Sequence, residues 1–417
     1  MVGIVLPGMT RSQEEDSLDE LSFLASTAGA EVVGRTIQER RIADSATLIG
    51  TGKVHQAAKQ VAELGAEVVL FDTDLSPIQV KNLEKGINRR VVDRSGLILD
   101  IFARRARTRE SQIQVELAQL QYLFPRLTRR WTHLERQEAG IGTRGPGETQ
   151  LEVDRRSIRK RIAHLQKELK HVELQRNVRR KGREAYTKIA LVGYTNVGKS
   201  SLLNALADAD VFVENRLFAT LDATIRAMIL KDHRRILLID TVGFIRKLPA
   251  HLVASFRSTL EETIEADLLL HVVDVSHPRY EDQIGSVQMV LEELEIADKP
   301  TLMVFNKVDL LADRKDLPVI KQRFRWAVFT SAVRGMGLAE LRREIVGLLN
   351  KNEEEGEVRV PASESKAIAV VYRMASVFEK TYEDGDAVIR FRAKSKDIER
   401  IHAVVEKICG HACTDRG

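Results

Sequence analysis

The stretch Gly193-Tyr-Thr-Asn-Val-Gly-Lys-Ser200 decides the fold of the central part of the chain. It follows the apolar run 188–192 and precedes the helix-like segment 201–206. A strand that enters a glycine-rich turn and then a helix gathers backbone N–H groups and the positive end of a helix dipole at one point. The two glycines let the backbone come close to a ligand, and a lysine and a hydroxyl follow at the start of the helix. The pattern predicts a phosphate-binding loop.

Three further motifs come after apolar strands, in the order expected of a nucleotide-binding domain. The motifs are Asp240–Gly243, Asn306–Asp309 and Ser331–Ala332, and the strands before them are 236–239, 302–305 and 327–330. The carboxylate of Asp309 can accept hydrogen bonds from N1–H and the exocyclic amine of guanine, whereas adenine has neither donor there. The combination predicts a GTPase that selects GTP over ATP. A weaker signal is Phe218–Asp222, which falls where a loop must cover the γ-phosphate.

These motifs define the expected site. The residues expected to contact GTP or GDP are Gly193, Tyr194, Thr195, Asn196, Val197, Gly198, Lys199, Ser200, Ser201, Phe218, Ala219, Thr220, Leu221, Asp222, Asp240, Thr241, Val242, Gly243, Asn306, Lys307, Val308, Asp309, Ser331, Ala332 and Val333. We expect Mg²⁺ to be held by the hydroxyls of Ser200 and Thr220 and by the carboxylate of Asp240. The groups expected to act in catalysis are Lys199, Thr220 and Gly243, whose N–H senses the γ-phosphate.

Composition limits the class of protein. A length of 417 residues predicts two to four domains, and two cysteines imply no disulfide framework. The apolar runs are too short to span a bilayer, so we expect a soluble cytoplasmic protein with no transmembrane segment. The net charge of +5 is uneven, because residues 104–185 carry 21 Lys and Arg against 10 Asp and Glu. The basic character therefore belongs to one segment.

The expected fold is an α/β chain of four parts. Residues 1–103 alternate β-branched runs with helical stretches near 17–28, 53–64, 76–85 and 95–104, which predicts a small parallel α/β subdomain. The runs are Ile4–Leu6, Val32–Val33, Val68–Phe71 and Val91–Val92. Residues 186–350 form the P-loop GTPase domain, and residues 358–417 a small α+β domain. Gly50-Thr-Gly-Lys53 opens one helix and indicates a tight turn; a second nucleotide site is the alternative.

Residues 104–185 are expected to form a long antiparallel helical hairpin. Apolar residues recur every three or four positions from Ile113 to Leu134 and again from Leu151 to Val172, as in two helices with facing seams. Pro125 should kink the first helix. The glycine-rich stretch 140–148 suits a compact tip. The outer faces carry Arg155, Arg156, Arg159, Lys160, Arg161, Arg176, Arg179, Arg180, Lys181 and Arg183, which indicates a surface for folded RNA; a merely solvated helix face is the alternative.

The carboxyl-terminal part carries weaker signals. Glu353–Glu357 is predicted as a charged linker, Ala367–Val371 and Ala387–Phe391 as strands, and Glu383–Asp386 as a turn. Residues 377–382 are ambiguous, and a helix is expected over 396–408. Cys409, His411 and Cys413 lack a second ligand pair, so unligated tail residues are favoured over a metal site.

The four nucleotide motifs resemble those of translation-factor-related GTPases of the Obg–HflX superfamily. The segments Gly140–Glu152 and Phe218–Asp222 are similar to those of the HflX family, and the resemblance covers about residues 1–350. It implies a cytosolic GTPase that binds the large ribosomal subunit. We expect contacts with ribosomal RNA and none with DNA, and a monomer. Its helical arm would reach toward the peptidyl-transferase region, and it would split or rescue ribosomes under stress. Glu138, Ala139 and Ala223 depart from the family pattern.

The residue after Gly243 predicts the kinetics. GTPases that orient water by themselves carry Gln there, whereas this chain has Phe244, which cannot hydrogen-bond water. Intrinsic hydrolysis should therefore be slow and stimulated by ribosomes, unless another side chain substitutes. Asn196 occupies a position at which related GTPases bind K⁺; simple loop packing is the alternative. Two other functions stay open: assembly of the large subunit, and a signalling switch whose arm recruits a protein effector.

Overall fold

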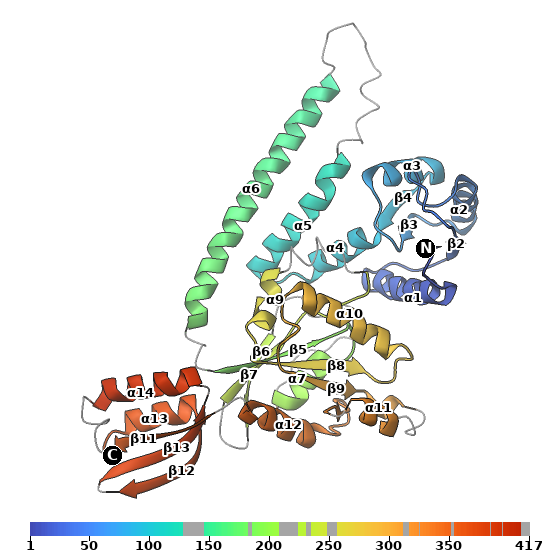
Figure 1. Cartoon of the computed structure of the whole chain (residues 1–417). Coiled ribbons are helices and arrows are strands. Elements are labelled where there is room, and N and C mark those ends of the chain that lie inside the picture. Colours follow the sequence, from blue (N-terminus) through green and yellow to red (C-terminus); the bar gives the residue numbers. More distant parts are fainter. Residues whose placement is uncertain are drawn as a thin grey trace. The chain divides into compact units, whose positions relative to one another are not determined.

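The computed structural model of the chain describes residues 1–127, 146–181, 186–207, 224–230, 235–247, 257–311, 317–324, 326–351, 354–383, 385–393 and 395–409. The chain forms two compact units. One unit contains residues 1–175 and a short segment that begins at Ile245, and the other contains most of the remaining chain. Figure 1 shows the elements of both units.

A four-stranded parallel sheet forms the amino-terminal part, in the order β2-β1-β3-β4. Parallel neighbours need crossover connections, and a helix follows each strand. The strands are β1 (Val2–Val5), β2 (Thr36–Glu39), β3 (Val68–Phe71) and β4 (Arg90–Asp93); the helices are α1 (Arg11–Thr27), α2 (Thr51–Leu64), α3 (Pro77–Ile87) and α4 (Arg94–Arg105). Capping boxes at Thr10 and Ser76 satisfy free N–H groups at the starts of α1 and α3.

One strand prediction in this part was wrong. Val32 and Val33 lie in the loop before β2, and Val33 is 50% exposed. The actual strand, Thr36–Glu39, is an edge strand in which no residue is fully buried, so it does not need an apolar run. Gly50 is the N-cap residue of α2, and Thr51 is the first helical residue.

Two long helices follow, α5 (Arg109–Leu127) and α6 (Pro146–Lys181). Ile113 and Leu117 pack against Leu165, so the predicted apolar seam is present. Ion pairs join Arg109 to Glu168 and Glu116 to Arg161. Because the earlier residue of α5 pairs with the later residue of α6, the two helices run in opposite directions. Pro125 lies inside α5.

The predicted tip is only partly described. Pro146–Glu148 belong to α6 rather than to a loop, because proline is tolerated in the first turn of a helix. Trp131, Leu134 and residues 138–145 lie outside the described residues.

A six-stranded sheet forms the middle of the chain, in the order β10-β9-β8-β5-β7-β6, with only β6 antiparallel to its neighbour. The strands are β5 (Thr187–Gly193), β6 (Thr224–Ile229), β7 (Arg235–Asp240), β8 (Leu268–Asp274), β9 (Thr301–Asn306) and β10 (Val328–Phe329). The helices are α7 (Lys199–Ala207), α9 (Arg257–Ile264), α10 (Tyr280–Glu293), η1 (Val308–Leu310), α11 (Leu317–Arg323) and α12 (Leu338–Lys351). In Figure 1, α10 covers one face of this sheet, and α7 and α12 cover the other.

The order of the strands explains which of them are buried. The central strands β5 and β8 are buried almost throughout, as expected for parallel strands with helices on both faces. Because parallel strands end at one edge, the carboxyl ends of β5, β7 and β9 bring the predicted nucleotide motifs together.

The last part is a three-stranded antiparallel sheet in the order β11-β13-β12, packed against two helices. Its elements are β11 (Glu354–Pro361), α13 (Ser365–Met374), β12 (Ser376–Glu383), β13 (Asp386–Ala393) and α14 (Ser395–Cys409). The strand at 387–391, the turn near Gly385 and the final helix were predicted correctly. The ambiguous residues 377–382 lie in β12.

Two predictions here were wrong. Ala367–Val371 is helical, because Ala367 and Val371 are both fully buried and lie four residues apart on one helix face. Residues 354–357 of the predicted linker belong to β11, where Glu355 and Glu357 form ion pairs with the arginines of β13. Cys409 ends α14, whereas His411 and Cys413 lie outside the described residues.

Within the described part of the chain, no helix combines the length and the apolar character needed to cross a membrane.

Candidate nucleotide-binding site

The loop between β5 and α7 has the backbone that the sequence predicted. Gly193 has φ +149°, and a Cβ there would lie 2.2 Å from the carbonyl oxygen of Val272. Gly198 has φ +93°, and its Cβ would lie 2.5 Å from Nδ2 of Asn306. Both positions therefore require glycine. Asn196, between them, is also left-handed, with φ +61°.

Lys199 folds back over this loop. Its Nζ donates to the carbonyl oxygens of Tyr194 at 2.7 Å and Gly193 at 3.2 Å. The side chain is buried, and this burial lowers the pKa of Lys199 to about 8, although the carboxylate of Asp240 acts in the opposite direction. A phosphate would supply the negative charge that a buried ammonium group lacks here.

Ser200 and Asp240 lie together beside the loop. The Oγ atom of Ser200 donates to Oδ2 of Asp240 at 2.5 Å, and Asp240 is 1% exposed at the end of β7. A hydroxyl and a carboxylate are hard oxygen ligands, so the pair fits Mg²⁺. The third expected ligand, Thr220, and its neighbours Phe218, Ala219, Leu221 and Asp222 lie outside the described residues.

The segment Asp240–Phe244 packs directly on the phosphate loop. A Cβ on Gly243 would lie 2.7 Å from Cα of Thr195 and 2.9 Å from Nζ of Lys199. Phe244 donates its N–H to Gly193 O at 3.1 Å and accepts from the N–H of Thr195 at 2.7 Å. Its ring is only 2% exposed. Sequence reasoning noted that Phe244 cannot orient water, but it missed this backbone pairing.

Asn306 joins the two sides of the site. Its Nδ2 donates to Val197 O at 2.9 Å, while Oδ1 accepts from the N–H of Ala332 at 3.0 Å and from the hydroxyl of Thr330 at 3.3 Å. The side chain is 2% exposed. One amide thus connects the phosphate loop to the segment after β10, and the predicted Ser331 and Ala332 are held beside it.

The other residues that are expected to hold the guanine base lie at a tight turn after β9. Lys307 is left-handed, with φ +65°, and its Nζ lies 2.7 Å from Oδ2 of Asp274. Asp309 follows in the short helix η1. Asp274 was missed, although it directly follows the apolar run 268–273 and ends β8. Val333 is 82% exposed.

A buried histidine was also missed. His271 lies in β8, opposite Val192 in the register with β5, and is 2% exposed. Burial, together with the nearby charge of Lys199, lowers the pKa of His271 to about 4. The side chain is therefore neutral at pH 7.

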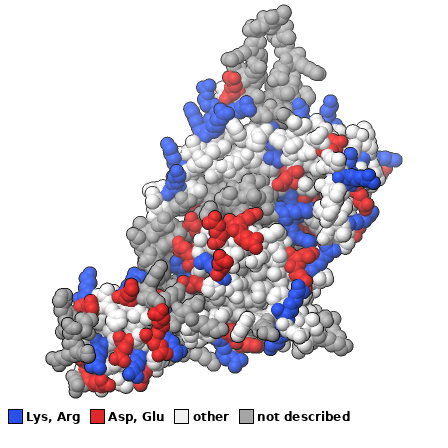
Figure 2. All heavy atoms as spheres, viewed as in Figure 1, with Lys and Arg blue, Asp and Glu red and all other residues white. Residues whose placement is uncertain are grey.

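The described Lys and Arg side chains of the basic helix α6 differ in whether a carboxylate pairs with them. Arg161 forms two hydrogen bonds with Glu116, at 2.7 and 2.8 Å, within the helix pair. Arg156, Lys160, Lys167 and Lys170 are exposed, and none of them has a carboxylate partner within 4.0 Å among the side chains that the structure describes. At 100° per residue these four lie on one stripe. Figure 2 shows Lys and Arg side chains gathered along this helix.

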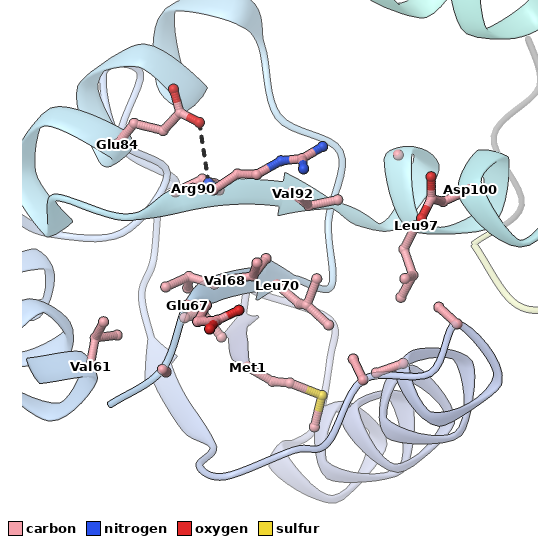
Figure 3. Close-up of a pocket in the computed structure, with 18 of the residues that line it drawn as sticks. Met1, Val61, Glu67, Val68, Leu70, Glu84, Arg90, Val92, Leu97 and Asp100 are labelled. Carbon is pink, nitrogen blue, oxygen red and sulfur yellow. Dashed lines mark hydrogen bonds between the residues drawn. The ribbon is translucent and has the colours of Figure 1, made fainter. Parts of the chain in front are cut away.

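A separate cavity of about 1460 Å³ lies in the amino-terminal unit. Figure 3 shows its apolar side, with Met1, Val68, Leu70, Val92 and Leu97. In the same view, the N–H of Val91 in the edge strand β4 donates to Oε1 of Glu84 at 3.3 Å. The turn at residues 50–53 is not among the described residues that line this cavity, so the cavity gives no support to a nucleotide at that turn.

Comparison with known proteins matches three family descriptions along the chain. These are "GTP-binding GTPase N-terminal" over residues 15–103, "GTP-binding GTPase Middle Region" over 105–183 and "50S ribosome-binding GTPase" over 188–307. Together they cover more than half of the chain.

Several similar proteins carry the name "GTPase HflX". The protein from Flavobacterium psychrophilum is 53% identical, over 76% of this chain and 78% of its own length. The protein from Escherichia coli is 44% identical, over 94% and 93%. A solved GTP-binding protein of Sulfolobus solfataricus in complex with GDP is 25% identical over 84% of this chain and 98% of its own, with a TM-score of 0.43.

Proposed function

The chain belongs to the HflX family of GTPases, and from that premise we propose that it binds the large ribosomal subunit and splits or rescues ribosomes under stress. The observation that carries the proposal is the stripe of four exposed cations on α6, which no described carboxylate neutralises. Such charges suit the phosphates of folded RNA, because displaced counterions make the contact favourable. The proposed setting is the cytoplasm, and the proposed active form is a monomer.

The roles within the GTPase site are proposed as follows. Lys199 neutralises phosphate charge, and the N–H of Gly243 contacts the γ-phosphate. Ser200, Thr220 and Asp240 hold Mg²⁺, which supplies further charge neutralisation when bound. Asp309 reads the guanine edge, and Lys307 is held in place by Asp274. The segment after β10 closes over the base.

Hydrolysis should be slow without a partner. Phe244 occupies the position of the water-orienting glutamine, and its ring is buried. We expect large ribosomal subunits to raise the GTP turnover rate by about tenfold or more, because the water-orienting group must come from outside the chain. Asn196 is proposed to bind K⁺ in the phosphate loop. Turnover would then be faster in KCl than in NaCl at equal ionic strength, whereas equal rates would exclude this role.

The main experiment measures light scattering of intact ribosomes mixed with the protein and a non-hydrolysable GTP analogue. A fall in scattering indicates splitting. The variant Lys160→Gln with Lys167→Gln removes two charges from the stripe and should split ribosomes at least tenfold more slowly. The control, Lys59→Gln with Lys85→Gln, removes two exposed charges from α2 and α3 and should behave like the parent.

Added salt separates the alternatives. Contacts to phosphates lose affinity steeply between 50 and 200 mM salt, whereas an apolar effector surface does not. Binding to large subunits without any splitting would instead support a role in subunit assembly. Unchanged splitting by the double Gln variant would refute the role of the stripe.

A further inference from the structure

The segment that follows the γ-phosphate motif ends in a buried charge cluster. Lys247 lies four residues after Gly243, and its Nζ contacts two carboxylates from the amino-terminal sheet unit. It lies 3.0 Å from Oε2 of Glu14 and also donates to Oδ2 of Asp72. Both carboxylate side chains are completely buried. Lys247 has a left-handed backbone, with φ +52°.

The cluster is tied into the sheet unit from several sides. Asp72 also accepts from Nη1 of Arg94 at 2.6 Å and from the hydroxyl of Ser17 at 2.6 Å. Oε1 of Glu14 accepts from the N–H of Ile4 at 3.1 Å. Gly3 provides the space, since a Cβ there would lie 2.7 Å from Oε1 of Glu14.

Arg94 holds the same segment at a second point. Its Nη2 donates to the carbonyl oxygen of Arg246 at 2.9 Å and to Oε2 of Glu20 at 2.5 Å. Arg94 is 1% exposed, so its position is fixed by buried contacts. Arg246 is therefore held by one main-chain contact, and Lys247 by two side-chain contacts.

Loss of the positive charge of Lys247 would destabilise the folded structure around this cluster. Arg94 and Lys247 balance two of the three carboxylates of Glu14, Glu20 and Asp72. Burial raises the pKa of Glu14, and Lys247 opposes that rise. Without Lys247, Arg94 would face the three carboxylates alone, and Glu14 would keep no cation beside it in this cluster, which strongly disfavours the charged arrangement.

The other end of the segment is bound to the phosphate loop. Phe244 exchanges two backbone hydrogen bonds with Gly193 and Thr195, and the chain passes from one compact unit to the other between Phe244 and Ile245. Only Ile245 and Arg246 separate the phosphate-loop contact from Lys247. Three residue steps from Phe244 to Lys247 span at most about 11 Å of extended chain.

We propose that Lys247 is a positioning residue that couples the nucleotide state at Gly243 to the amino-terminal sheet. The side chain does not touch the nucleotide. It transmits movement of Gly243 to Glu14, and through Glu14 to the N–H of Ile4 in β1. The proposal rests on the nucleotide site and requires no ribosome, so it can fail independently of the proposed ribosomal role.

The test measures hydrogen exchange of the Ile4 amide in the full chain, bound either to GDP or to a non-hydrolysable GTP analogue. The exchange rate should differ at least fivefold between the two complexes of the parent. In Lys247→Met the two rates should become equal, and Lys247→Arg should restore the difference. Lys59→Met, at an exposed lysine of α2, is the matched control and should retain it.

A second variant covers the case in which Lys247→Met does not fold. Glu14→Gln with Lys247→Met removes one charge of each sign, so it should fold and still show equal rates in both complexes. Two results would overturn the proposal. One is an Ile4 exchange rate in the parent that does not depend on the nucleotide, and the other is a difference that persists in Lys247→Met or in the double variant.

Discussion

Replacing Asn306 by alanine removes the three hydrogen bonds that connect the phosphate loop to the segment after β10. The lost partners are the carbonyl oxygen of Val197, the N–H of Ala332 and the hydroxyl of Thr330, at 2.9, 3.0 and 3.3 Å. A hydrogen bond contributes about 1 kcal/mol net, and a buried group left without a partner costs about 1–3 kcal/mol. We therefore expect the free energy of unfolding to fall by about 3 kcal/mol, or roughly a hundredfold in the equilibrium constant.

Urea unfolding measures this loss, and titration with a fluorescent GDP analogue measures its effect on binding. Affinity should fall with stability, because both connected segments are expected to contact the nucleotide. Asn306→Asp retains the Oδ1 acceptor but places a second carboxylate oxygen against the carbonyl oxygen of Val197 in a buried site, so its loss should be at least as large as that of Asn306→Ala. Asn82→Ala is the control, since Asn82 makes one exposed hydrogen bond, to Ala46. If Asn306→Ala costs no more than this control, the connecting role of Asn306 is refuted.

Two further predictions concern buried titratable groups. Because the pKa of Lys199 is lowered to about 8, nucleotide binding should take up a proton near pH 8 and almost none near pH 6.5. Calorimetry in buffers of different ionisation enthalpy measures this uptake, and an equal uptake by Lys199→Arg would contradict the assignment. The lowered pKa of His271, about 4, predicts stability that is present above pH 6.5 and is lost, by up to about 3 kcal/mol, as the pH falls toward 4. His271→Gln should abolish this acid slope in urea unfolding while the exposed His277→Gln keeps it, and an unchanged slope in His271→Gln would exclude the histidine as its source.

The central sheet was the part most open to prediction, since its buried strands are continuous apolar runs that end in polar motifs. The phosphate loop, Asp240 and Asn306 could be placed because each follows such a run. The partners of these residues could not, since contacts such as Lys307 with Asp274 or Phe244 with Gly193 depend on which strands are neighbours in the sheet. The expected roles of Thr220 and its loop stay predictions.

The wrong predictions in the carboxyl-terminal part have physical causes. The run 367–371 is short and apolar, so its periodicity alone cannot distinguish a strand from a buried helix turn. The glutamates of β11 looked like a linker because their cross-strand arginines lie more than 30 residues away in the sequence. The buried cluster around Lys247 could not be predicted from the sequence for the same reason, since its members come from four separate stretches of the chain.

The amino-terminal sheet has an uneven seam. β1 pairs with β2, and β3 with β4, along four register positions each, whereas β1 and β3 meet at the single pair Val2 and Phe71. The sheet therefore consists of two well-paired halves, and the backbone contact between them is limited to this register position and the hydrogen bond from the N–H of Asp72 to Val2 O at 3.1 Å. Ile4 belongs to one half and donates its N–H to Glu14, and Asp72 adjoins the other half, so Lys247, which contacts both Glu14 and Asp72, connects the two halves through side chains.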